Sequence, residues 1–391
     1  MGRVDLSAAE IVDAHTHPYR LEGLLERDPA GFDTRMMFLG ESFLSSSRID
    51  PDLWPFVDGM TDSTVFGIAL VRRLAAHLGC ETTRGAVTEA RASALRADPT
   101  GYTKGLLDAA GIVAVLADEG YPQPSVPADE FARTIGVPVH RVARLEPWIL
   151  AHRQGVFDEL VDGVEAEATA AAADPNCVAY KSIVAYRTGL DVGDPGAPDA
   201  AAAFDRWRSD DWRESREHAK PVRDHLIRRT LAVAKANDRP FHFHCGGGDP
   251  DIHLAHARPV DLFPLLVDVQ DQPVLLVHSG YPWVREAAYI ASVLPNVSLE
   301  LSELIPWGFG QVEWALEMLV GTVPAAKLLY GSDEAGEPES FWISALLARR
   351  ALERVLDRFV ERDYVSAADA DRLGRLVLAG ACRAMHGLQA S

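Results

Sequence analysis

The stretch Asp13-Ala14-His15-Thr16-His17-Pro18 directly follows a short apolar run, Ile11-Val12. On a β-strand, residues at i and i+2 face the same side, so both imidazoles would point the same way and could hold one metal ion. Later apolar runs end in His244, His278 and Asp333, which are residue types that complete the shell of a divalent cation. The recurrence of such residues at the ends of apolar runs predicts a metal site built on parallel strands.

Short β-branched or apolar runs recur along the chain, separated by segments long enough for a helix. This pattern is typical of a parallel sheet with helical crossovers. The predicted strands are residues 10–16, 112–117, 139–145, 177–184, 240–244, 274–278, 297–301 and 327–331. Strands that are each followed by a helix close into a (β/α)₈ barrel, so the sequence predicts the α/β class and a TIM barrel.

Helical segments are predicted between these strands. They cover residues 128–135, 157–173, 222–237, 259–269, 284–293, 311–320 and 340–359. An open doubly wound sheet is the alternative architecture. It is disfavoured because Gly246-Gly247-Gly248 follows the fifth predicted strand rather than the first, and because it is not a Gly-x-Gly-x-x-Gly turn.

Two segments are too long to be simple connections. Residues 18–105 lie between the first and second predicted strands and carry periodic apolar positions, which predicts a helical cap. Residues 188–221 follow the fourth strand and predict an insertion of loops and helix. Both leave the C-terminal end of a strand, where barrel enzymes build their sites, so we expect them to set substrate choice. The chain, residues 1–391, is predicted to be a single domain.

Composition limits the classes of partner. The chain is 48% hydrophobic and carries a formal net charge of −19, which argues against nucleic acid because phosphate binding needs clustered Lys and Arg. Its four cysteines lie far apart without a Cys-x-x-Cys pair, which disfavours a disulfide framework and a structural zinc knuckle. No stretch approaches the roughly 20 apolar residues of a membrane span, and the N-terminus lacks a signal-like apolar segment. We therefore expect a cytoplasmic protein with no membrane partner.

In a barrel, the ends of strands one, five, six and eight meet at one mouth. This would bring together five potential ligands, His15, His17, His244, His278 and Asp333. Imidazole and carboxylate suit one or two divalent ions, with Zn²⁺ favoured and Mn²⁺ or Fe²⁺ as alternatives. Taken singly, each histidine could instead be a core or rim residue that hydrogen-bonds a backbone carbonyl.

Lys181 lies inside the fourth predicted strand, where a charged side chain that points into an apolar barrel is costly unless something neutralises it. A desolvated amine can take up CO₂, and the resulting carbamate would bridge two metal ions. The alternatives are a buried lysine paired with Asp333 or Glu303, or a lysine that faces the helices.

Arginine and tryptophan residues that follow the strands are candidates for contact with substrate. They are Arg144, Arg187, Arg285, Trp283, Trp307 and Trp342. A guanidinium can bind a substrate carboxylate through two parallel hydrogen bonds, and tryptophans could form an aromatic wall. Surface salt bridges and core packing are the alternatives. The predicted substrate-binding residues are Arg187 and Trp283.

Several of these segments resemble the amidohydrolase superfamily, in particular the amidohydrolase-related branch that includes the FluG-like proteins. The matching segments are residues 13–18, 179–190, 243–246, 276–282 and 330–333, and residues 378–383 resemble the closing helix of the family. The resemblance implies a (β/α)₈ barrel in which His15, His17 and Asp333 hold one metal ion. His244 and His278 would hold a second ion, or His278 would act beside a single one, with Lys181 as a candidate carbamylated bridge.

The first functional hypothesis is hydrolysis of a C–N bond, in an amide of a small amino-acid-like or carboxylated compound, by a metal-activated water. Asp333 and His278 would transfer the protons. The second is an O₂-dependent monooxygenase with Fe or Fe/Mn, as in some FluG-like relatives, which hydroxylates a small amino acid or acid. A nonoxidative decarboxylase is the third, and a structural subunit without activity is the last. We expect a small-molecule substrate and a homo-oligomer, or a hetero-oligomer with a paralogue.

Overall fold

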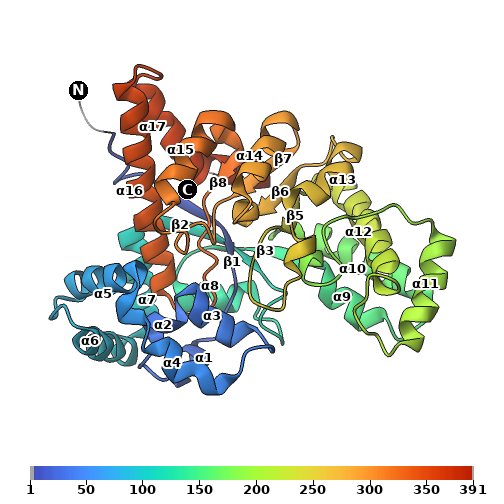
Figure 1. Cartoon of the computed structure of the whole chain (residues 1–391), viewed down its shortest axis with the longest axis horizontal. Coiled ribbons are helices and arrows are strands. Elements are labelled where there is room, and N and C mark those ends of the chain that lie inside the picture. The colour runs from blue at the N-terminus through green and yellow to red at the C-terminus, as the bar shows by residue number, and fades with distance from the viewer. Residues whose placement is uncertain (1–3, 390–391) are drawn as a thin grey trace.

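The computed structural model describes residues 4–389, and within them eight parallel strands form one sheet in the order β1 to β8 (Figure 1). Their bounds are β1 (Ile11–Thr16), β2 (Ile112–Asp118), β3 (Val139–Arg144), β4 (Cys177–Ser182), β5 (Phe241–His244), β6 (Val274–Val277), β7 (Val297–Glu300) and β8 (Leu328–Leu329). The Ala14 N–H donates to the Tyr330 carbonyl at 2.9 Å, and the Asp333 N–H donates to the His15 carbonyl at 2.9 Å. These bonds join the last strand to the first, so the predicted TIM barrel is confirmed.

Some strands are shorter than predicted because side chains take over their backbone partners. After β4, the Ile183 N–H donates to the Glu146 carboxylate and the Val184 N–H donates to the Ser182 hydroxyl. Such local bonds compete with the ladder of a sheet. The chain therefore turns into a 3₁₀ segment, Val184–Tyr186, where the sequence predicted that the strand continues.

Helices cover the outside of the barrel. They are α7 (Pro99–Ala110), α8 (Ala128–Ile135), α9 (Leu145–His152), α10 (Phe157–Ala173), α12 (Ala219–Ala236), α13 (Phe263–Asp268), α14 (Val284–Val293), α15 (Val312–Thr322), α16 (Glu339–Glu361), α17 (Ala367–Arg375) and α18 (Ala381–His386). The predicted bounds of α8, α10 and α14 agree with the structure. The helix predicted at 259–269 is instead a 3₁₀ turn, Pro259–Leu262, followed by α13, and α9 was not predicted.

The segment between β1 and β2 supplies a helical cap beside the mouth of the barrel, at the lower left of Figure 1. Its helices are α1 (Leu21–Glu26), α2 (Phe32–Arg35), α3 (Phe38–Ser45), α4 (Trp54–Asp58), α5 (Val65–Leu78) and α6 (Arg84–Ala97). The buried Arg91 of α6 ties this cap to the barrel, since it binds Glu337 at 2.5 Å and Glu339 at 2.6 Å. The cap is therefore held on the barrel by ion pairs between side chains as well as by apolar packing.

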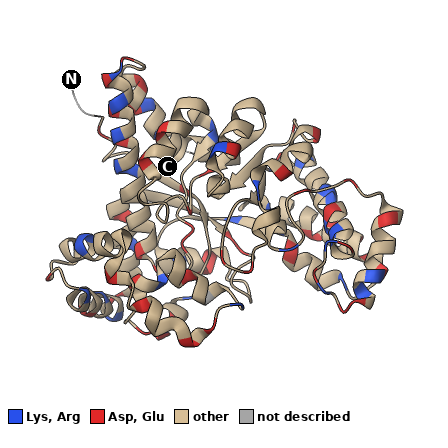
Figure 2. Ribbon diagram, viewed as in Figure 1, with Lys and Arg blue, Asp and Glu red and all other residues tan. Residues whose placement is uncertain are grey.

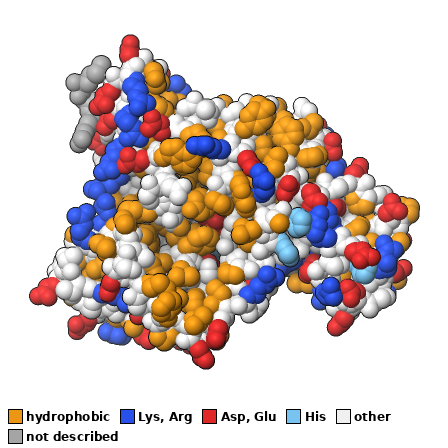
Figure 3. All heavy atoms as spheres, viewed as in Figure 1, with side chains coloured by type: hydrophobic (Ala, Val, Ile, Leu, Met, Phe, Trp, Pro, Cys, Tyr) orange, Lys and Arg blue, Asp and Glu red, His pale blue; other side chains and the backbone are white. Residues whose placement is uncertain are grey.

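The surface of the cap exposes large apolar side chains. Large exposed side chains on it include Leu25, Leu39, Leu53 and Phe56, and hydrophobic atoms gather over the same region in the space-filling view (Figure 3). Elsewhere, acidic and basic side chains are interspersed over the helices (Figure 2). Among the described residues, no helix combines the length and the apolar character needed to cross a bilayer.

The second insertion folds away from the mouth. It carries α11 (Ala197–Ser209), which packs against α10 and α12 and lies at the right-hand edge of Figure 1. Trp207 of α11 is fully buried, and the Arg223 guanidinium lies 5.3 Å from its ring centroid. No residue between 188 and 221 lines the cavity at the C-terminal ends of the strands. The structure therefore does not support the expectation that this insertion sets substrate choice.

Two buried histidines, His242 and His386, pair below the layer of the barrel that carries His244. The His386 Nδ1–H donates to the Cys382 carbonyl at 2.9 Å, because a carbonyl can only accept. The other nitrogen of His386, Nε2, therefore accepts from the Nε2–H of His242 at 2.9 Å. His242 thus packs in the layer below His244.

This pair predicts a pH dependence of stability. Burial holds the pKa of His386 at about 4, below its ordinary value. As the pH falls from about 6.5 to about 4, the unfolded chain takes up a proton that the native state refuses, so stability should fall over this window. Urea denaturation of the wild type and of His386→Gln at several pH values should show a smaller loss for the variant. Parallel curves for the two proteins would contradict the prediction.

Candidate metal centre

A cavity of about 310 Å³ opens where the C-terminal ends of the strands meet. Its wall contains six of the predicted site residues, which are His17, Lys181, Arg187, His244, His278 and Asp333. Three residues at this cavity have unusual backbone conformations. The φ angles of His278, Glu303 and Asp333 are positive, at 66°, 59° and 54°. Such angles are rare outside glycine and cluster at functional sites.

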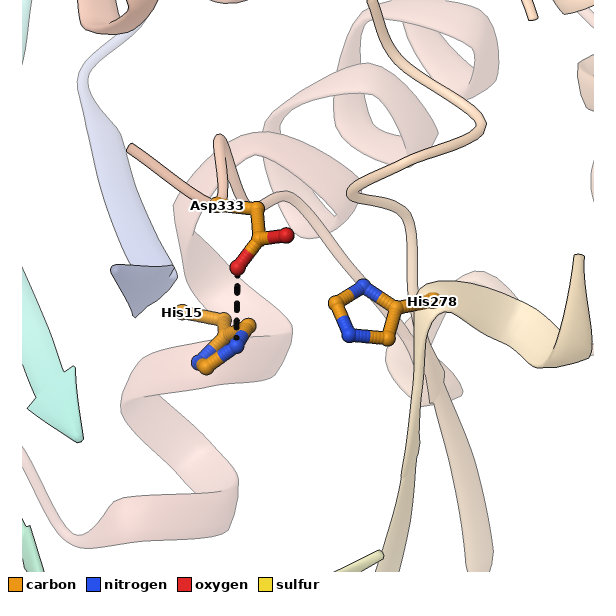
Figure 4. A group of neighbouring side chains, drawn as sticks. All are labelled: His15, His278 and Asp333. Carbon is orange, nitrogen blue, oxygen red and sulfur yellow. Dashed lines mark ion pairs between the residues drawn. The ribbon is translucent and has the colours of Figure 1, made fainter. Parts of the chain in front are cut away.

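The carboxylate of Asp333 faces two imidazoles of β1 and the loop that follows it. Its Oδ1 lies 3.1 Å from Nε2 of His15 and 3.4 Å from Nε2 of His17. Figure 4 shows that Asp333, His15 and His278 point toward one another from three separate parts of the ring. Burial opposes ionisation, but attraction to the neighbouring imidazoles of His278, His15 and His17 holds the pKa of Asp333 well below its ordinary value.

Hydrogen bonds fix the orientation of His278. Its Nδ1 lies 2.9 Å from the Ser302 hydroxyl, which donates to Glu300 at 2.7 Å. Because the hydroxyl donates its one hydrogen to Glu300, it accepts from Nδ1–H, so the lone pair of His278 is on Nε2. The Nε2–H of His244 donates to the Gly247 carbonyl at 2.7 Å, which leaves the lone pair of His244 on Nδ1.

These two lone pairs face each other at 3.0 Å between His278 Nε2 and His244 Nδ1. Two acceptors at this distance repel each other unless a cation or a proton lies beside them. Burial lowers the pKa of His244 to about 3, so a proton on this ring is disfavoured. The arrangement therefore fits a bound cation.

Further groups complete a set of donors that suits a metal ion. Groups whose ligand atoms lie within 4.8 Å of one another are His15 with His278 and Asp333, His15 with His17 and Asp118, and His244 with His278 and Glu303. Oδ1 of Asp333 and Oε2 of Glu303 are buried and accept no hydrogen bond within the described chain. A mixture of imidazole nitrogen and carboxylate oxygen suits Zn²⁺, Mn²⁺ or Fe²⁺.

Lys181 points into the barrel and is buried there. Its Nζ lies 3.0 Å from Oδ2 of Asp118 and 2.9 Å from Nε2 of His15. Its ion partner is thus Asp118, and neither Asp333 nor Glu303 as the sequence suggested. Burial lowers the pKa of Lys181, although the charge of Asp118 opposes this shift. Carbamylation of this amine stays a prediction.

Two acidic residues of the site were missed from sequence. Asp118 is the last residue of β2, and Glu303 follows β7 by three positions. The rule that strand ends carry the chemistry would have selected both. Asp118 also has a structural partner, because the Nε of Arg144 donates to its carboxylate at 2.9 Å. This pairing makes Asp118 harder to recognise as a metal-site residue.

The predicted substrate contacts divide into two groups. Arg187 lines the cavity and makes no ion pair with any residue from 4 to 389, whereas Arg144 is bound to Asp118. Trp283 does not line the cavity, because it precedes α14 outside the wall, and Trp307 lines it instead. The other two candidates lie elsewhere, since Arg285 stacks on Trp314 and Trp342 packs in α16.

A glycine turn supports His244. Gly246 has φ +107°, and a Cβ at this position would lie 2.3 Å from the Tyr281 carbonyl oxygen. Gly246→Ala should destabilise the protein by roughly 1–3 kcal/mol and displace the neighbouring carbonyl that binds His244. Gly105→Ala is the matched control, because its helical position has open space around it. Equal denaturation midpoints for the two variants would contradict the prediction.

Comparisons with known proteins bear on this site. A family model described as Amidohydrolase matches residues 12–372. Protein fluG of Emericella nidulans is 37% identical over 205 residues, which are 50% of this chain and 24% of that protein. The chain therefore spans about a quarter of the length of this relative.

Solved structures share the fold. A putative metal-dependent hydrolase from Lactobacillus casei ATCC 334 has a TM-score of 0.80 at 24% identity and covers 99% of this chain and 98% of its own. A uronate isomerase from Bacillus halodurans C-125 has a TM-score of 0.67 at 13% identity, with 98% and 94% covered. At these identities the likeness establishes the barrel architecture and leaves the reaction to the residues of the site.

Proposed function

Because this chain belongs to the amidohydrolase family and is FluG-like, we propose that it is a metal-dependent hydrolase that cleaves the C–N bond of a small amino-acid-like or carboxylated amide. The observation that carries the proposal is that three imidazoles and Asp333 line one cavity, with His15 grouped directly with His278 and Asp333. A divalent cation held by these side chains would lower the pKa of a water molecule from about 15.7 toward about 7 and polarise the substrate carbonyl.

Asp333 is the group that moves the proton. Asp333 lines the cavity, its Oδ1 has no hydrogen-bond partner among residues 4–389, and its low pKa keeps the carboxylate ionised at neutral pH. It would accept a proton from the attacking water and deliver it to the leaving nitrogen. The C–N bond then breaks to give a carboxylic acid and an amine.

His278 assists from beside Asp333, since ligand atoms of the two side chains lie within 4.8 Å of each other. The Ser302 and Glu300 pair fixes its Nδ1–H, so its Nε2 presents a lone pair to the reacting groups. Arg187 would bind a carboxylate of the substrate, since its guanidinium lines the cavity without an acidic partner. Lys181 keeps Asp118 charged and close to His15.

A second candidate is an O₂-dependent monooxygenase that hydroxylates a small amino acid or acid. The observation in its favour is the pair of additional carboxylates, Asp118 and Glu303, in the donor groups around His15 and His278. Oxygen-rich sets of this kind suit iron and manganese as well as zinc.

One experiment separates these activities. Bound metals are measured in protein purified without added salts, and a panel of small amides and amino acids is then assayed with and without O₂. Zinc or manganese with hydrolysis that is independent of O₂ supports the hydrolase. Iron with uptake of O₂ overturns it in favour of the monooxygenase, and release of CO₂ without O₂ would indicate a decarboxylase.

A further inference from the structure

Two carboxylates of the cavity wall lack a basic partner. Glu41 comes from α3 of the cap, and Asp249 comes from the loop after β5. Neither makes an ion pair with a residue between 4 and 389, although one oxygen of Asp249 accepts the Asp251 N–H at 2.8 Å. Ser45 lies beside both, because its hydroxyl lowers the pKa of each carboxyl group. The two acids are thus neighbours on different elements.

The environment of this pair favours a cation. Burial, followed by the charges of Asp333 and Asp249, raises the pKa of Glu41 to about 8. Burial also raises the pKa of Asp249. In each case burial is the main cause, and no ion-paired cation among the described residues offsets it. A ligand that brings an ammonium group between them would restore both to the ionised form.

A guanidinium, that of Arg187, lines the same cavity. The charge of Arg187 acts on the carboxyl group of Asp249, yet the two side chains make no ion pair. The only hydrogen bond of the Arg187 side chain within residues 4–389 runs to the Tyr186 carbonyl at 3.4 Å. The cavity wall therefore offers a guanidinium and two carboxyl groups that make no ion pair with any residue from 4 to 389.

Glu303 is a further acid of the cavity wall, and its ligand atom lies with those of His244 and His278. The side chain of Glu303 is 2% exposed, and its Oε2 accepts no hydrogen bond within the described residues. Buried acceptors in native proteins nearly always have a partner. The cavity is of the size expected for a small ligand, about 300 Å³ or more.

We propose that the substrate carries a free α-amino acid head, with its carboxylate on Arg187 and its ammonium between Glu41 and Asp249. This inference rests on the proposed amide hydrolysis and specifies its substrate class. The carboxylate and the ammonium of the head can bind in this way only if neither is part of an amide bond. The amide that is cleaved therefore lies on the side chain of the substrate. Water adds its hydroxyl to the side-chain carbonyl carbon, the C–N bond breaks, and Asp333 returns the proton to the departing amine.

Binding of the acid product tests this assignment without turnover. Titration calorimetry on the metal-loaded protein would compare L-glutamate with glutarate, which lacks the ammonium, and with 4-aminobutyrate, which lacks the α-carboxylate. L-aspartate and succinate form a shorter pair. We expect the amino acid to bind about 10-fold or more tighter than its analogues, because each analogue loses one charge-assisted contact.

Variants assign each contact. Glu41→Gln and Asp249→Asn should each reduce the preference for L-glutamate over glutarate, and Arg187→Met should reduce the preference over 4-aminobutyrate. Glu26→Gln, an exposed acid of the cap, is the matched control and should change neither ratio. Thermal unfolding of each variant checks that it is folded.

The outcomes separate this inference from the proposed function. Equal binding of L-glutamate and glutarate, no binding of either amino acid, or unchanged ratios in the variants would overturn the amino acid head. Hydrolysis of uncharged amides would then still support the hydrolase. Selective binding of L-glutamate without hydrolysis of its side-chain amides would leave the head group standing and remove the hydrolase.

Discussion

Asp333→Asn is expected to lower kcat/KM by about 10²- to 10⁴-fold, the usual contribution of a proton-transferring group. The amide keeps the shape of the carboxylate but cannot accept a proton from water. It also removes the negative charge that lies 3.1 Å from His15 and 3.4 Å from His17, so the affinity for metal should fall. Activity and bound metal are both measured. Loss of activity alone identifies the role of Asp333 in proton transfer, and loss of metal identifies its role as a ligand.

The matched control is Asp363→Asn. Asp363 has φ 57°, close to the 54° of Asp333, but it lies on the surface after α16. Asparagine tolerates this left-handed conformation, so both variants should fold. Turnover of Asp333→Asn above a tenth of the wild-type value, with metal bound, would show that another group moves the proton.

Arg91→Met is expected to destabilise the protein by about 3–5 kcal/mol, because it leaves buried acidic groups without their cation. Arg91 is 2% exposed and holds Glu339 through two bonds of 2.6 and 3.1 Å. After the substitution, Glu337 keeps Arg35 as a partner, whereas Glu339 keeps only the hydroxyl of Tyr102. The denaturation midpoint in guanidinium chloride measures the loss.

Arg133→Met is the control for the second variant. Arg133 is 70% exposed and pairs with Asp129 on the surface of α8, where such a pair contributes about 0–1 kcal/mol. A similar midpoint shift in both variants would mean that the network of the cap adds no stability beyond that of a surface pair. Because α6 and α3 belong to one cap, Arg91→Met should also weaken substrate binding through the displacement of Glu41.

The strand-end residues could be predicted because a barrel brings all its strand ends to one rim. His15, His244, His278 and Asp333 each end an apolar run, so their convergence followed from the strand pattern. Trp283 shows where this reasoning stops. It lies five positions beyond His278, and a loop of that length can turn its side chain away from the mouth.

Sequence by itself determined the order of strands and helices, the barrel, and the inward imidazoles, because hydrophobic periodicity and strand alternation are local properties. The tertiary structure alone decided that Lys181 pairs with Asp118, and that Glu41 of a cap helix joins Asp249 of a barrel loop. These pairings join residues far apart in the chain, and their distances depend on how the cap packs over the ring. No local pattern records that packing, because it is the sum of many contacts between separate elements.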